Sequence, residues 1–350
     1  MTLPLAGLLV LDFTTLLPGP LATLMLAEAG AEVIKIEPPG GEAMRGYPPF
    51  VGQESATFAM LNRGKQCLVL DLKDKGARDE IEGLLARADI LVEQFRPGVM
   101  ARLGLDYDSI ARRHPRIVYC SISGYGQSGP RVGEAGHDLN YIGNTGLLAL
   151  QPGRDGPTVP PGLIADIAGG SFPAVINILL ALRQRDATGK GCHLDIAMSD
   201  AMFTFAWHAL GTAAATGRFP GSGEGLLVGG SPRYQLYRTR DGKLVACAAL
   251  EEKFWRAFCA AIGLKEPKDL VDPQGTIEAV AAIIARRTAE EWKPVLAAAD
   301  CCATIVQSLQ EALADPHFVA RGLFAHKIAL KERDIPALPL PIAPHLRRKP

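Results

Sequence analysis

A histidine and an aspartate stand side by side in the polar, glycine-bracketed segment GHDLNYIGNTG, residues 136–146. A loop of this kind can expose the imidazole of His137 to a cleft. Because the unperturbed pKa of an imidazole is near 6.5, His137 could act as a base near neutrality if a partner oriented it. A lone histidine is more often structural, so the segment makes His137 a candidate for proton transfer and no more.

Two carboxylates are further candidates. Asp166 opens a long apolar stretch in GLIADIAGGS, where an aspartate is a common N-cap, and from the residues alone we favour the cap. The AGGS that follows offers backbone N–H groups at a helix start, which suit an anion or a developing oxyanion. Glu251 directly follows the strand-like KLVACAAL, a position that can face a cleft, although helix-start electrostatics would explain it equally well.

Several basic residues stand near the ends of expected strands, and each alone is most simply a solvated surface charge. Ligands of parallel α/β sheets bind beyond the carboxyl ends of the strands. Basic side chains at consecutive strand ends could therefore converge on phosphates. The candidates are Arg63, Lys65, Lys73, Arg96 and Arg102.

Apolar runs alternate with segments of helical spacing through the first 124 residues. Such alternation predicts parallel strands joined by crossover helices, that is, a doubly wound α/β sheet. The expected strands cover 7–13, 31–40, 66–73, 89–95 and 116–124, and the expected helices cover 19–30, 75–87 and 98–113.

The second half predicts one long apolar helix over 166–191 and then a smaller α+β domain. Glycines and prolines gather in residues 216–233, the best linker candidate. A hairpin that turns at Asp241 and Gly242 follows, with short helices after it. We therefore expect a large domain (1–190), a linker (191–225), a small domain (226–315) and a C-terminal return to the large domain (316–350).

Composition excludes several classes of function. Lys plus Arg and Asp plus Glu balance at 37 each, so no basic field points to nucleic acid or to a membrane surface. The seven cysteines form no CxxC pair, which indicates reduced thiols and no metal site. The lack of a signal peptide and of a long uncharged apolar run predicts a soluble cytoplasmic protein without a membrane span. The turn TTLLPGP lacks G-x-G-x-x-G, which disfavours NAD or FAD.

Five segments, taken together and in order, resemble the family III CoA transferase superfamily, and within it the alpha-methylacyl-CoA racemases. The resemblance implies a Rossmann-like, doubly wound large domain with a smaller α+β domain. It also implies an interlocked homodimer whose subunits share the active site, an acyl-CoA substrate, and no cofactor beyond the CoA moiety of that substrate. The segments are LLPGPLATLMLAEAGAEVIKIEPPGGEAMR, ADILVEQFRPGVMARLGLDY, SISGYGQSGP, GHDLNY and DGKLVACAALEEKFW.

The resemblance also implies a role for individual residues. His137 and Asp166 match the proton-transfer pair of the racemases, and Glu251 matches a residue that orients this pair through a hydrogen bond. Related racemases often carry an arginine where this chain has Pro38, and Arg45 is the nearby candidate to replace it. The residues that would contact CoA are Leu70, Asp71, Leu72, Lys73, Gln94, Phe95, Arg96, Arg102, Gly136, His137, Asp138, Leu139, Asn140 and Tyr141.

The reaction expected from this resemblance is inversion of the α-carbon of 2-methylacyl-CoA thioesters in lipid metabolism. His137 and Asp166 would work on opposite faces of an enolate, and backbone N–H groups at the Asp166 helix start would stabilise its oxygen. The acyl chain would slide over apolar side chains such as those of AMFTFAW, although that stripe is more simply core. The identity of the acyl chain is not legible, because apolar grooves discriminate weakly between chain lengths.

Two other readings stay open. One is CoA transfer between carboxylic acids, with Asp138 as the nucleophile that passes through a mixed anhydride. The presence of His137 before that aspartate and of Glu251 favours the racemase, whereas the extended 39–60 segment looks transferase-like. The other is a non-catalytic CoA-binding protein, which would need none of the three candidate catalytic side chains.

Overall fold

The computed structural model describes residues 2–153 and 156–349, which form two compact units. Unit 1 comprises Met1–Thr145, Pro161–Phe203 and Val319–Pro350, and unit 2 comprises Gly146–Pro160 and Thr204–Phe318. The predicted small domain lies within unit 2. The predicted linker does not exist as such, because its residues 192–197 form a strand of the large sheet. Gly191 allows this strand to start, since a Cβ there would lie 1.8 Å from the carbonyl oxygen of Ile117.

Unit 1 is built on a six-stranded sheet in which all pairs are parallel. The predicted α/β class with a large parallel sheet is confirmed. The order reverses between β1 and β6, and crevices at such a reversal are where open parallel sheets bind ligands. Across the sheet the strands are β5 (Gln66–Val69), β2 (Glu32–Glu37), β1 (Leu9–Phe13), β6 (Ile90–Glu93), β7 (Val118–Ser123) and β8 (Cys192–Ala197).

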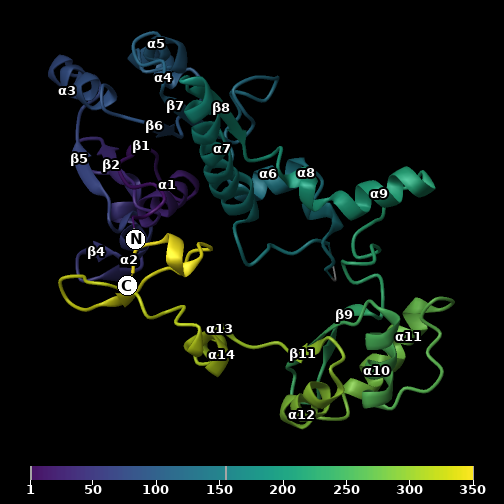
Figure 1. Ribbon diagram of the computed structural model, residues 1–350. Helices are drawn as coiled ribbons and strands as arrows, with labels where there is room; N and C mark the ends of the chain where they lie inside the picture. The colour runs from purple at the N-terminus through teal and green to yellow at the C-terminus, as the bar shows by residue number, and fades with distance from the viewer. Residues whose placement is uncertain (1, 154–155, 350) are drawn as a thin grey trace. The chain divides into compact units, whose positions relative to one another are not determined.

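Helices cover both faces of this sheet. On one face α1 (Pro18–Glu28) packs against α7 (Phe172–Thr188), and Figure 1 shows α7, in teal, alongside β7 and β8. On the other face, α3 (Lys75–Leu85), α4 (Val99–Leu103) and α5 (Tyr107–Ala111) bury apolar residues such as Leu11 and Tyr119.

The helix predicted over 98–113 is broken in two. Gly104 adopts a φ of +69°, a left-handed conformation that ends α4. Asp106 then caps α5, accepting a hydrogen bond from the N–H of Ser109. The apolar spacing continued across the break, so the periodicity alone could not show it.

Unit 2 contains a three-stranded antiparallel sheet in the order β11-β10-β9. Its strands are β9 (Tyr234–Arg238), β10 (Leu244–Ala248) and β11 (Ala303–Ile305), and the first two form the predicted hairpin. Buried Trp255, Phe258 and Trp292 join this sheet to α10 (Glu252–Ile262), α11 (Pro273–Ile284) and α12 (Ala289–Ala299).

The remaining elements are short. They are the helices α2 (Ala56–Asn62), α6 (Asp138–Asn144), α8 (Met202–Phe205), α9 (Trp207–Thr216), α13 (Leu309–Leu313) and α14 (Pro316–Ala320), the strands β3 (Phe50–Val51), β4 (Glu54–Ser55), β12 (Lys327–Ile328) and β13 (Ile335–Pro336), and the single turns at Ala43–Gly46, Leu148–Leu150 and Pro344–Leu346.

The long apolar stretch predicted as one helix starts as a π-helix, Ala165–Ser171, and continues as α7. By length and composition, Ala165–Thr188 is the single helical stretch within residues 2–153 and 156–349 that could cross a membrane. Of its most apolar window, 44% is buried inside the protein, and core helices of soluble proteins pass the same test of length and composition. π-Helical turns occur frequently at functional sites.

Buried charges hold the segment that follows β1. Asp12 and Lys65 form a salt bridge of 3.0 Å with both side chains fully buried, and Asp12 also accepts hydrogen bonds from Thr14 and Thr23. Lys35 donates to the carbonyl oxygen of Thr14 at 2.7 Å. Burial lowers the pKa of Lys65 to about 8, against the opposing pull of Asp12, so the amine remains charged at pH 7.

Replacing Lys65 with Met should destabilise the protein by about 3–5 kcal/mol, because Asp12 would keep a buried charge without its partner. Urea unfolding at pH 7 measures this. Arg113→Ala provides the control, since the Arg113–Glu82 pair is nearly half exposed and its loss should cost about 1 kcal/mol or less. Equal effects of the two changes would contradict this account of the network.

Candidate active site

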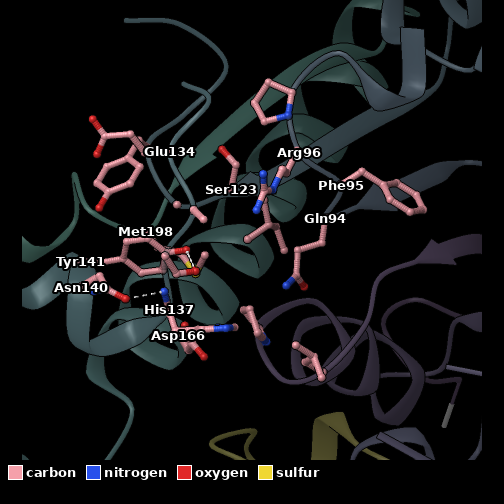
Figure 2. Close-up of a pocket in the computed structure, with 18 of the residues that line it drawn as sticks. Gln94, Phe95, Arg96, Ser123, Glu134, His137, Asn140, Tyr141, Asp166 and Met198 are labelled. Atoms are coloured by element: carbon pink, nitrogen blue, oxygen red, sulfur yellow. Dashed lines mark hydrogen bonds between the residues drawn. The ribbon is translucent and has the colours of Figure 1, made fainter. Parts of the chain in front are cut away.

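One cavity of about 440 Å³ lies in unit 1, where β1, β6, β7 and β8 end. Its walls come from the turn after β1, from the turn after β6, from the end of β7 and the loop that follows it, and from the starts of α6 and the π-helix. Figure 2 shows His137 and Asp166 together at one side of this cavity. The two predicted proton-transfer residues are therefore brought to one place.

His137 is the N-cap residue of α6, so the segment expected to be a loop is a helix start. Its N–H donates to Oδ1 of Asn140 at 3.0 Å, and its carbonyl oxygen accepts from the N–H of Asn140 at 2.8 Å (Figure 2). The backbone and Asn140 thus fix the helix start, which leaves the exposed imidazole to face the cavity.

Two glycines make room for the ring of Tyr141 beside His137. A Cβ on Gly124 or Gly136 would lie 2.5 Å or 2.7 Å from a ring carbon of Tyr141. The Tyr141 hydroxyl donates to the carbonyl oxygen of Gly136, which closes the turn before His137. Packing against Tyr141 therefore explains Gly124 and Gly136.

Asp166 lies in the first turn of the π-helix, half-buried on the cavity wall. Burial, together with the charge of Asp138, raises the pKa of its carboxyl to about 6, and His137 acts in the opposite direction. No hydrogen bond of the capping kind to this carboxylate is found among the described residues, so the N-cap favoured from the sequence is wrong. A carboxyl with a pKa near neutrality in a cavity is a candidate acid or base.

The two glycines of the AGGS motif allow close packing. A Cβ on Gly169 would lie 2.5 Å from the carbonyl oxygen of Met198, and one on Gly170 would lie 3.0 Å from Pro18. The N–H of Asp166 donates to Oδ1 of Asp138 at 2.9 Å. Because that N–H already has an acceptor, it is not a free donor, whereas the expected role of the other backbone N–H groups at this helix start stays a prediction.

Asp138 contacts Asp166 but does not itself line the cavity. Its side chain is only 4% exposed and it is not among the residues that line the cavity. It holds the backbone of Asp166 and raises the pKa of the Asp166 carboxyl. The predicted nucleophile is therefore covered in this structure, and its observed contacts are those of a positioning residue.

Asp138→Asn should lower the pKa of Asp166 below its present value of about 6. The asparagine oxygen can still accept from the N–H of Asp166, so the change removes a neighbouring charge and preserves the geometry. Carbon-13 NMR titration of the Asp166 carboxyl measures the shift, with Asp200→Asn as a control on an exposed aspartate. An unchanged titration would mean that burial alone sets this pKa.

The residues expected to contact CoA fall into two groups. Gln94, Phe95, Arg96, Gly136, His137, Asn140 and Tyr141 line the cavity. Leu70, Asp71, Leu72, Lys73, Arg102, Asp138 and Leu139 do not. Of this second group, Asp71, Lys73 and Arg102 are exposed just after β5 or on α4, whereas Leu70 is buried in the core.

Three of the basic candidates are already paired. Arg45 binds Glu37 through two hydrogen bonds of 2.6 and 2.7 Å, which makes it a poor replacement for the arginine missing at Pro38. Arg63 pairs with Glu28, and Lys65 pairs with Asp12. Sequence reasoning missed these pairings because each joins residues that no local pattern connects.

Sequence reasoning also missed Glu93, the last residue of β6. Its carboxylate accepts from the N–H of Phe95 at 2.8 Å and so fixes the turn that carries Gln94 and Arg96. Burial raises the pKa of Glu93 to about 6. The available signal was an acid at a strand end directly before QFR.

The start of α1 is not a phosphate cradle. Its N1 and N3 residues are Pro18 and Pro20, which have no N–H, and the N–H of Gly19 donates to Oε1 of Gln94 at 3.0 Å. This agrees with the missing G-x-G-x-x-G. Within residues 2–153 and 156–349, no group of three or more His, Cys, Asp or Glu side chains is placed to hold a metal ion.

Glu251 belongs to unit 2. It is the exposed N-cap residue of α10, and its side chain makes no capping hydrogen bond. Its role in orienting a catalytic pair stays a prediction.

The chain is similar to several known proteins. The sequence model of CoA-transferase family III matches residues 5–347. Acetyl-CoA:oxalate CoA-transferase from Acetobacter aceti is 39% identical over 75% of this chain and 68% of its own, and human alpha-methylacyl-CoA racemase is 33% identical over 97% and 86%. The crystal structure of a CAIB/BAIF family protein from Brucella suis superimposes with a TM-score of 0.83 at 29% identity, covering 98% of this chain and 93% of that one.

Proposed function

The chain belongs to CoA-transferase family III, and from this premise we propose that it is a racemase that inverts the α-carbon of 2-methylacyl-CoA thioesters. One observation carries the proposal. An imidazole and a carboxyl of raised pKa, 29 residues apart in the sequence (166 − 137), line the same cavity. Two different proton-transfer groups at one cavity are what a two-base inversion requires.

Inversion removes one proton from the α-carbon and adds one to its opposite face. One group, His137 or ionised Asp166, takes the α-proton, and the electrons of that C–H bond form the C=C bond of an enolate while the C=O pair moves to oxygen. The other group, which starts protonated, gives a proton to the opposite face of the α-carbon. The carbonyl reforms and the configuration is inverted. A carboxyl pKa of about 6 places Asp166 close to an imidazole in basicity, so either group can begin as the base.

The similarity to CoA-transferases supports CoA transfer as a second candidate reaction. In that reaction a cavity carboxylate attacks the acyl-CoA carbonyl and expels CoA as a thiolate. Since Asp138 is covered and Asp166 lines the cavity, the nucleophile would be Asp166 and not the residue expected from the sequence. The racemase is supported better because nucleophilic attack by Asp166 assigns no role to His137.

The experiment is incubation of one enantiomer of a 2-methylacyl-CoA in D2O. Deuterium at the α-carbon together with inverted configuration supports the racemase. CoA passing to an added carboxylic acid without α-deuteration supports the transferase. Bound CoA with neither reaction supports the non-catalytic reading.

We also propose that the chain works as a cytoplasmic homodimer with a Rossmann-like unit 1. Supporting evidence is the order of the parallel strands and the apolar face that α7 exposes through Ile176, Leu179 and Leu180. The AMFTFAW stripe, expected to be mainly core, likewise exposes Phe203 and Phe205. Such apolar area on a surface marks an interface.

Leu180→Arg should convert the dimer to monomer, because Leu180 is 63% exposed, the most exposed of the three residues, and a charge there resists burial. Light scattering after size-exclusion chromatography gives the mass. Arg183→Lys on the same helix keeps the charge and is the control. A wild-type monomer at micromolar concentration would contradict the proposal directly.

A further inference from the structure

The proposed reaction needs a hydrogen-bond donor that the two bases do not supply. Whichever group takes the α-proton, negative charge develops on the thioester oxygen, and a donor aimed at that oxygen lowers the barrier. The N–H of Asp166 is engaged by Asp138, so the donor must come from another part of the wall.

Gln94 offers one donor whose direction is fixed. Its Oε1 accepts from the N–H of Gly19 at 3.0 Å, and since only the oxygen of a carboxamide can accept, Nε2 must point the other way. Nε2 makes no hydrogen bond among the described residues. Gln94 lines the cavity, and Figure 2 shows its amide extending toward the side that holds His137 and Asp166.

Ser123 offers a second donor from the neighbouring strand. It is the last residue of β7, lines the cavity and is only 8% exposed, yet its hydroxyl has no hydrogen-bond partner within the described residues. Leaving a buried hydroxyl unpaired costs about 1–3 kcal/mol. The oxygen itself is buried in this rotamer, so binding a ligand requires rotation about the Cα–Cβ bond to another staggered position.

The two donors emerge from adjacent strand ends. Strand β6 pairs with β7 so that Glu93 lies opposite Ser121, and Gln94 and Ser123 follow these partners at the carboxyl edge of the sheet. We propose that Nε2 of Gln94 and Oγ of Ser123 together bind the thioester oxygen of the acyl-CoA and stabilise its negative charge. The inference rests on the proposed function only in requiring an acyl-CoA carbonyl in this cavity.

Gln94→Glu and Ser123→Ala test the two donors separately. The glutamate can still accept from the N–H of Gly19 but replaces the donor with a negative charge. Each change should lower kcat for α-deuterium exchange by about 100-fold and leave the Kd for free CoA, measured by calorimetry, within about threefold. Ser123→Thr restores a hydroxyl and should recover most of the lost kcat.

The unfolding temperature of Ser123→Ala shows whether Ser123 donates to the substrate or stabilises the fold. Because the hydroxyl of Ser123 has no partner to lose, Ser123→Ala should unfold at the same or a higher temperature. Ser199→Ala is the matched control: this buried serine donates to Asp200 and does not line the cavity, so its removal should leave kcat unchanged and lower stability slightly.

Wild-type exchange is measured first and decides the proposed function by itself. If the wild type instead transfers CoA, the same variants are assayed for transfer, since that reaction also charges the acyl oxygen. Unchanged kcat in both Gln94→Glu and Ser123→Ala overturns the inference, whichever reaction the wild type performs. A loss of CoA affinity equal to the loss of activity would also overturn it, because both residues would then be binding residues only.

Discussion

Asp166→Asn should abolish racemisation, with a fall of at least about 1,000-fold, and yet leave α-deuterium exchange on one enantiomer of the substrate. In the proposed mechanism each base faces one side of the α-carbon. Without the Asp166 carboxyl, His137 can still remove a proton from its own side and return deuterium to that side. Proton NMR of each pure enantiomer in D2O measures exchange, and chiral chromatography measures inversion.

The same variant also tests stability, which should increase at pH 7.5 although activity falls. The pKa of Asp166 is about 6 in the folded protein and 3.8 in a free aspartate, so the folded state holds this proton more tightly. That contribution to stability is complete below about pH 4 and is lost as pH rises through about 6. At pH 7.5 the ionised carboxyl is therefore a cost that asparagine removes.

Asp166→Asn should accordingly unfold at a higher temperature than wild type at pH 7.5, and the difference should shrink toward pH 4. Asp200→Asn, at an exposed site, should show no such pattern. Full racemase activity in Asp166→Asn, or a lower unfolding temperature at pH 7.5, would reduce Asp166 to a structural residue.

Five strands of the parallel sheet, β1, β2, β5, β6 and β7, could be predicted from their apolar runs. Strand β8 was missed because polar His193 and Asp195 interrupt its apolar residues. Val10, Ile90 and Val118 are completely buried, and nothing but a strand between two helical layers requires such residues at these places. The split of the 98–113 helix could not be predicted, because Gly104 left the apolar spacing intact on both sides.

The candidate site was predictable in part. His137, Gln94, Phe95 and Arg96 stand next to strand ends or helix starts, where the topology of a parallel sheet gathers side chains. What could not be predicted is which polar groups are already paired. The bond from Asp166 to Asp138 spans 28 residues, so the distinction between a free donor and an engaged one appears only in three dimensions.

His137→Ala should show the mirror image of the Asp166 variant. Racemisation should again fall by at least about 1,000-fold, while exchange persists on the enantiomer that Asp166 serves and disappears on the other. The helix start should survive, because the backbone of residue 137 and the side chain of Asn140 make hydrogen bonds there that do not involve the imidazole. Circular dichroism and the Kd for CoA provide the controls.

The complementary losses are what distinguish two bases from one. A single-base enzyme would lose exchange on both enantiomers in one variant and on neither in the other. The double variant His137→Ala with Asp166→Asn should exchange neither enantiomer, although each single variant exchanges one. If exchange in both single variants fell on the same enantiomer, the two side chains would serve one face of the α-carbon, and inversion would need a third proton carrier from elsewhere in the protein.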